Sequence, residues 1–102
     1  MVTIYHNLAL SNARLALDMP QFSDLELVGI ALNTDNLDEA FDLTIHRDGE
    51  NWTDDNSVMF FGDRRSRRSS HEGDVFILSD GTAHLVLTQG FRHLPHLRLP
   101  FL

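Results

Sequence analysis

The chain has 102 residues, of which 42% are hydrophobic and 23% are charged, and this balance fits one soluble globular domain over residues 1–102. The absence of cysteine excludes a disulfide framework, a thiolate zinc site and a cysteine nucleophile. No apolar run approaches the ~20 residues of a membrane helix, and the N-terminus lacks the pattern of a secretion signal. We therefore expect a cytoplasmic protein without membrane contact.

Two apolar patterns near the N-terminus predict strands. Residues 2–6 place Val2, Ile4 and His6 on one face of an extended segment, which is typical of a short, half-buried strand. Residues 25–32 form the longest apolar run, and its length of eight residues predicts a central strand.

A helix is predicted over residues 36–46. Apolar residues recur there at the spacing of one helix face, and acidic residues occupy the other face. The preceding Asn33-Thr34-Asp35 consists of residue types that cap the N-termini of helices.

The second half predicts a polar loop at 50–57, a short strand at 58–61, and a hairpin in which residues 74–78 and 83–87 flank an Asp-Gly turn. The apolar tail at about 91–102 contains two prolines and is expected to pack as an extended segment. These elements predict an α+β fold, with about four or five strands in an antiparallel or mixed sheet and one main helix packed on it.

Charge is divided unevenly along the chain. Residues 1–63 hold twelve acids and two arginines, whereas residues 64–102 hold three acids and six arginines, so formal charges of −10 and +3 sum to the stated −7. Net acidity disfavours binding of a phosphate backbone over the whole surface, and the local arginine cluster leaves such binding open.

Catalytic and cofactor motifs are missing: the sequence has no nucleophile elbow, phosphate-binding glycine loop or dinucleotide fingerprint, and we expect no cofactor. His93 and His96 have a spacing common in metal loops, but Pro95 breaks the helical geometry that would aim both rings one way, so no metal site is expected. A small enzyme that uses His46 or His71 stays open as a third hypothesis.

Two charged surfaces are candidate binding sites. A helix face and the neighbouring loop would offer an acidic and aromatic contact to a basic protein partner through Asp35, Asp38, Glu39, Asp42 and Trp52. The alternative is an arginine cluster that clamps nucleic-acid phosphates or another anion through Arg64, Arg65, Arg67 and Arg68. A homodimer formed through the apolar tail is compatible with both.

Three short motifs resemble a known group of proteins. They are Leu37-Asp38-Glu39-Ala40-Phe41-Asp42-Leu43-Thr44-Ile45-His46 with the downstream Trp52, then Arg68-Ser69-Ser70-His71-Glu72-Gly73-Asp74-Val75, and finally Gly90-Phe91. The first resembles small uncharacterised proteins of actinobacterial and mobile-element genomes, and the second half resembles the YodL-like domain.

The resemblance implies a context rather than a chemistry. YodL-like modules occur in phage and conjugative-element proteins, and they carry no established catalytic residues. The sequence therefore favours a non-catalytic accessory protein of a phage, plasmid or other mobile element that binds another protein, with counter-defence as the most specific version.

Overall fold

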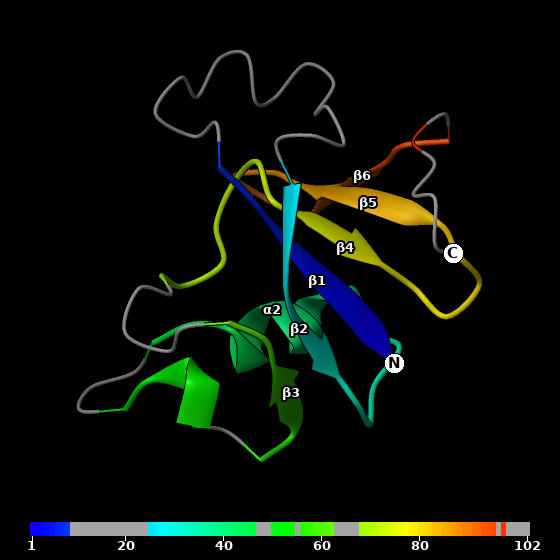
Figure 1. Ribbon diagram of the computed structural model, residues 1–102. Coiled ribbons are helices and arrows are strands. Elements are labelled where there is room, and N and C mark those ends of the chain that lie inside the picture. Colours follow the sequence, from blue (N-terminus) through cyan, green and yellow to red (C-terminus); the bar gives the residue numbers. More distant parts are fainter. Residues whose placement is uncertain (9–24, 47–49, 55, 63–67, 96, 98–102) are drawn as a thin grey trace.

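The computed structural model describes residues 1–8, 25–46, 50–54, 56–62, 68–95 and 97. Six strands form one antiparallel sheet with the order β3-β2-β1-β4-β5-β6. They are β1 (Val2–Asn7), β2 (Leu25–Ala31), β3 (Val58–Phe60), β4 (Val75–Ile77), β5 (Ala83–Val86) and β6 (Phe91–His93). Helix α2 (Leu37–Leu43) lies behind this sheet in Figure 1, so the predicted α+β class is confirmed.

The described sheet has six strands, and the expectation of four or five was too low. The additional strand is β6, which lies in the segment expected to be an extended tail. Only three residues long and largely exposed, it has no alternating pattern that a sequence reading would detect. Pairing with β5 defines it: Leu87 N–H donates to Gly90 O at 3.0 Å, and Leu94 N–H donates to Ala83 O at 2.8 Å.

Helix α2 begins as predicted but ends earlier. The Asn36 side chain caps its N-terminus by accepting a hydrogen bond from the Glu39 N–H at 3.0 Å. The helix ends at Leu43 instead of residue 46, because Thr44 leaves helical geometry and its carbonyl accepts from the Ser70 N–H at 2.8 Å. A contact with a segment 26 residues downstream therefore determines where the helix stops.

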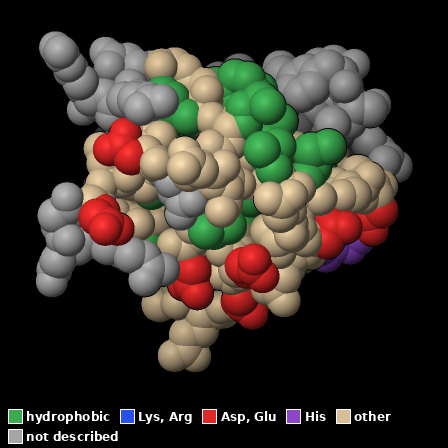
Figure 2. Space-filling model, turned by 90° about the horizontal axis from the view of Figure 1, so that it is seen from below, with side chains coloured by type: hydrophobic (Ala, Val, Ile, Leu, Met, Phe, Trp, Pro, Cys, Tyr) green, Lys and Arg blue, Asp and Glu red, His purple; other side chains and the backbone are tan. Residues whose placement is uncertain are grey.

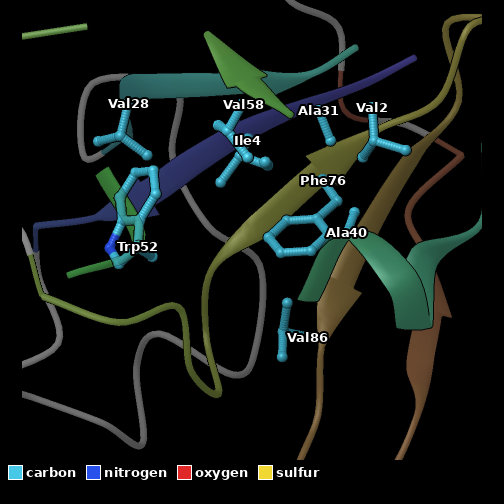
Figure 3. Close-up of a cluster of buried hydrophobic side chains, with 9 residues drawn as sticks. All are labelled: Val2, Ile4, Val28, Ala31, Ala40, Trp52, Val58, Phe76 and Val86. Atoms are coloured by element: carbon cyan, nitrogen blue, oxygen red, sulfur yellow. The ribbon is translucent and has the colours of Figure 1, made fainter. Parts of the chain in front are cut away.

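The core lies on both faces of the sheet, as expected where side chains alternate along buried strands. The face that packs on α2 is built from Val2, Ile4, Val28, Ala31, Ala40, Trp52, Val58, Phe76 and Val86, which Figure 3 shows. The opposite face is built from Tyr5, Val75, Ile77, Ala83, Leu85 and Leu94. Burial raises the pKa of Tyr5 to about 12, which keeps this side chain neutral in the second cluster.

The predicted hairpin is confirmed as β4 and β5. Its turn is closed by the Gly81 N–H donating to Leu78 O at 2.9 Å and the Leu78 N–H donating to Thr82 O at 3.0 Å. Gly81 adopts a φ of 85°, a conformation that favours glycine. The Asp80 carboxylate accepts from the Thr82 N–H at 2.9 Å and so holds the turn from inside.

Candidate functional site

Helix α2 turns three acidic side chains to the surface. Asp38, Glu39 and Asp42 are exposed, whereas Ala40 between them is buried in the core. Asp38 and Asp42 are four residues apart, so they lie on the same side of the helix, where like charges oppose helix formation by a few tenths of a kcal/mol. We call Asp38, Glu39 and Asp42 the α2 acidic surface.

Among the described residues, the Asp, Glu, Lys and Arg side chains visible on this end of the molecule are all acidic. Figure 2 views the molecule from below, with the part that carries α2 and β3 toward the reader. Acidic side chains are spread over this face, and no Lys or Arg side chain of the described residues is visible on it. Such a surface attracts a basic partner over distances of about a Debye length, roughly 8 Å at physiological ionic strength.

Asp35 was predicted to join this acidic contact, and the structure gives it a different setting. Its carboxylate accepts from the Ser79 hydroxyl at 2.6 Å and from the Met1 ammonium at 3.0 Å. The Ser79 hydrogen bond, helped by the one from the ammonium group, holds the pKa of Asp35 below its ordinary value. Because a positive charge already matches it, Asp35 is not part of the α2 acidic surface.

Trp52 was predicted to contact a partner, and the structure places its side chain in the core instead. Only 3% of it is exposed, within a short 3-10 helix over Trp52–Asp54 in the predicted loop. Its indole N–H donates to Arg68 O at 2.7 Å, and its ring makes an edge contact with Phe60. An added Cβ at Gly29 would lie 3.1 Å from both Met59 O and Val58 Cγ1 but at an ordinary 3.6 Å from the indole, so this glycine allows the close approach of β3.

Of the four arginines in the cluster, only Arg68 belongs to the described residues. Arg64, Arg65 and Arg67 lie outside the described residues. Arg68 was predicted to bind phosphate, but its guanidinium makes two hydrogen bonds to Asp74, Nη1 at 2.7 Å and Nη2 at 2.6 Å. A guanidinium held by a buried carboxylate in this way stabilises the fold, so the structure gives Arg68 a structural contact beside its predicted role in anion binding.

Asp74 is the centre of this polar cluster and is fully buried. Besides Arg68, its carboxylate accepts from the backbone N–H of Asn7 at 2.9 Å and from the backbone N–H of His71 at 2.9 Å. Four donors satisfy the four lone-pair positions of an ionised carboxylate. The Gly-Asp-Val motif thus has a structural role, since its aspartate ties the end of β1 to the segment before β4.

A serine and a histidine also meet in this cluster. Ser70 Oγ lies 3.1 Å from Nε2 of His6, and the same nitrogen lies 3.8 Å from the Asp74 carboxylate. In a catalytic triad the carboxylate bonds the opposite ring nitrogen, and the serine faces substrate. Here Nε2 of His6 faces both Ser70 and Asp74, and the side chains of His6 and Ser70 are each only 3% exposed. Sequence reasoning missed this contact, because nothing local connects residues 64 positions apart.

The two histidines considered for catalysis are both engaged with neighbouring backbone. Nδ1 of His46 accepts from the Trp52 N–H at 3.3 Å, and Nδ1 of His71 lies 2.9 Å from the Glu72 carbonyl oxygen. In neither of these two contacts is the partner of the ring a nucleophilic side chain. The enzyme hypothesis gains no geometric support from these contacts.

Another histidine pair lies across β5 and β6. His84 is opposite His93 in the strand register, and the two rings stack with centroids 5.1 Å apart. Burial lowers the pKa of His84, and His93 lowers it further, while Asp80 acts in the opposite direction.

This shift predicts that acid destabilises the protein through His84. The folded pKa lies below the ordinary 6.5, so the unfolded chain binds the proton first as the pH falls. The free energy of unfolding should therefore decrease from near pH 7 down to the folded pKa. We expect His84→Gln to flatten this decrease in the free energy of unfolding, measured by urea titration at several pH values in the presence of chelator. The matched control is His71→Gln. Equal slopes for His84→Gln and the wild type would contradict the prediction.

No helix in the described part of the chain is long and apolar enough to cross a membrane. Over the same residues, no group of three or more His, Asp or Glu side chains is arranged to hold a metal ion. Comparison with protein-family models, curated proteins and solved structures gives no match to the chain. The YodL-like resemblance therefore stays a prediction. The α2 acidic surface is the feature of the described residues that bears most directly on function.

Proposed function

We propose that this chain is a non-catalytic accessory protein of a phage, plasmid or other mobile element, and that it binds a protein partner with a basic surface through the α2 acidic surface. Counter-defence is the most specific form of this function. The observation that supports it best is the outward display of Asp38, Glu39 and Asp42 on a helix whose other side is anchored in the core. The motif resemblance supplies the biological context.

The anchoring matters because a rigid contact surface loses little conformational entropy when it binds. Ala40 is fully buried, and Leu37 and Phe41 pack against the same core cluster. The three carboxylates therefore project from a helix whose backbone is already fixed against the sheet. A basic partner would meet a prearranged set of charges instead of a loop that must first be ordered.

The test compares two variants that each lose three negative charges. Asp38→Asn, Glu39→Gln and Asp42→Asn together should weaken partner binding at least tenfold, mainly through a slower association rate at low salt. The control combines Glu50→Gln, Asp54→Asn and Glu72→Gln, and it should stay within about twofold of the wild type if charge position matters more than net charge. The partner is first isolated from host lysate at low salt and identified, and affinities are then measured with the purified protein.

Two outcomes would overturn the proposal. Equal losses in the α2 variant and the control would show that only net charge matters, and unchanged affinity in the α2 variant would place the contact elsewhere. Co-elution of nucleic acid that disappears at high salt would favour the arginine-cluster alternative instead, because counterion release makes such binding steeply salt-dependent. Replacement of Arg64, Arg65 and Arg67 by serine would then abolish it.

A further inference from the structure

The antiparallel pairing of β5 with β6 places two imidazole rings side by side at one edge of the sheet. His84 and His93 are direct partners in the register, and their rings stack at 27° with centroids 5.1 Å apart. Both residues belong to the described part of the chain, and His93 is exposed while His84 is half-buried. Such a pair is independent of the α2 acidic surface.

A hydrogen-bond chain determines which nitrogen of His84 carries the proton. The Thr82 hydroxyl donates to the Asp80 carboxylate at 2.6 Å, and Thr82 Oγ1 lies 2.8 Å from Nε2 of His84. An ionised carboxylate only accepts, so the single hydroxyl proton of Thr82 is directed to Asp80. The Nε2–H of His84 must then donate to Thr82, which leaves the lone pair of the neutral ring on Nδ1.

This arrangement is the one that metal-binding histidines adopt in proteins. Their second ring nitrogen usually donates to a carboxylate, a carbonyl or a water, and that bond sets the tautomer and the orientation of the ring. In His84 the bond passes through the Thr82 hydroxyl to Asp80. The ring is thus held with Nδ1 unprotonated, and its centroid lies 5.1 Å from that of the exposed His93 ring.

We propose that His84 and His93 chelate one divalent transition-metal ion of the class that prefers imidazole, such as Ni²⁺, Cu²⁺ or Zn²⁺, with Nδ1 of His84 as one ligand and the ring of His93 as the other. Metal–nitrogen bonds of about 2.0–2.1 Å require the two nitrogens to lie ~3 Å apart. Exposed His93 reaches this distance by side-chain rotation. Water completes the coordination of this open, two-ligand site.

Binding at this position links an edge strand to the sheet. β6 is joined to the rest of the fold through β5 and through Phe91, whose ring lies 5.7 Å from that of Phe76. A metal ion bridging His84 and His93 adds a connection that exists only when the two strands are paired. The ion therefore stabilises the folded state by an amount that grows with the logarithm of its concentration once this exceeds the Kd.

The experiment uses the untagged full chain and Ni²⁺ as the probe, because Ni²⁺ binds imidazole without redox chemistry under these conditions. Isothermal titration should show one Ni²⁺ ion bound per chain at this site, and the melting temperature should rise with Ni²⁺ and return to its starting value with chelator. His84→Gln and His93→Gln should each remove the binding event and the thermal shift. His71→Gln, which removes a histidine from another surface, should retain both.

The Thr82→Val variant tests the hydrogen-bond chain separately from the ligands. Valine preserves the shape of threonine but cannot bond Nε2, so we expect one-to-one binding that is about 10- to 100-fold weaker. Unchanged affinity in this variant would overturn the role assigned to Thr82. Binding that persists in His84→Gln or in His93→Gln would overturn the chelate itself.

Discussion

Replacing Asp74 by alanine is expected to lower the free energy of unfolding by about 3–5 kcal/mol, the usual loss when one partner of a buried ion pair is removed. Asp74 is fully buried, and its bidentate partner Arg68 is 34% exposed on the side chain. The variant leaves the guanidinium without its carboxylate and deprives the backbone N–H groups of Asn7 and His71 of their acceptor. Each unsatisfied buried donor costs about 1–3 kcal/mol by itself.

Urea unfolding measured by circular dichroism checks this value. The matched control is Asp38→Ala, which removes one exposed carboxylate and should change stability little. Since small domains have only about 5–15 kcal/mol of stability, Asp74→Asn serves as a milder variant if the alanine protein does not fold. The double variant Asp74→Leu with Arg68→Met should recover only the part of the loss that comes from the unpaired guanidinium, because the backbone N–H groups of Asn7 and His71 still lack an acceptor.

A loss below about 1 kcal/mol in Asp74→Ala would contradict the structural role given to the Gly-Asp-Val motif. That outcome would instead leave Asp74 available for a functional role. The cluster around it would then need to be reconsidered as a binding or catalytic site.

The second large effect is expected from Trp52→Ala, with a loss of about 3–5 kcal/mol in the free energy of unfolding. The indole is 3% exposed, contacts the rings of His6 and Phe60, and donates to the Arg68 carbonyl. Alanine creates a cavity on the α2 side of the sheet and leaves that carbonyl without its donor. Figure 3 shows the position of Trp52 beside Val28 in this cluster.

Trp52 is the single tryptophan of the chain, so fluorescence reports on it alone. The folded protein should emit at shorter wavelength than the unfolded one, and urea titration of the same signal gives the wild-type stability. For Trp52→Ala, circular dichroism replaces fluorescence. Trp52→Phe is the matched control: it keeps an aromatic ring, loses the N–H donor and should be destabilised less than the alanine variant. If Trp52→Ala kept the wild-type stability but lost partner binding, Trp52 would again be a candidate contact for the partner.

The two variants test whether the segment around Arg68, Ser69 and Ser70 has a structural role. Trp52 holds Arg68 by its carbonyl, while Asp74 holds it by its guanidinium. If both variants unfold the protein, the motifs that suggested a family resemblance are explained as packing and hydrogen bonding. The functional surface must then be sought among exposed residues, of which the α2 acidic surface is our candidate.

Local signals in the sequence were sufficient for much of the fold. The alternation at residues 2–6, the apolar run at 25–32 and the Asp-Gly turn each predicted the element found, within one or two residues. The cap types at Asn33-Thr34-Asp35 likewise predicted the start of α2 within one residue, although the residue that caps it is Asn36. These predictions succeeded because each depends on residues that lie within one turn or one hairpin of each other.

Tertiary structure decided the remaining features, since each depends on a partner far away in the sequence or on another strand. The end of α2 is determined by Ser70, and β6 exists only through its pairing with β5. Exposure of Trp52 was predicted from its polar surroundings, whereas its burial follows from contacts with residues far away in the sequence. Arg68 stays 34% exposed on the side chain, and Asp74 holds its guanidinium. The sequence suggested His93 with His96 as a histidine pair, and His96 lies outside the described residues. Strand register brings His93 to His84, because cross-strand neighbours are selected by hydrogen bonding between strands rather than by spacing along one.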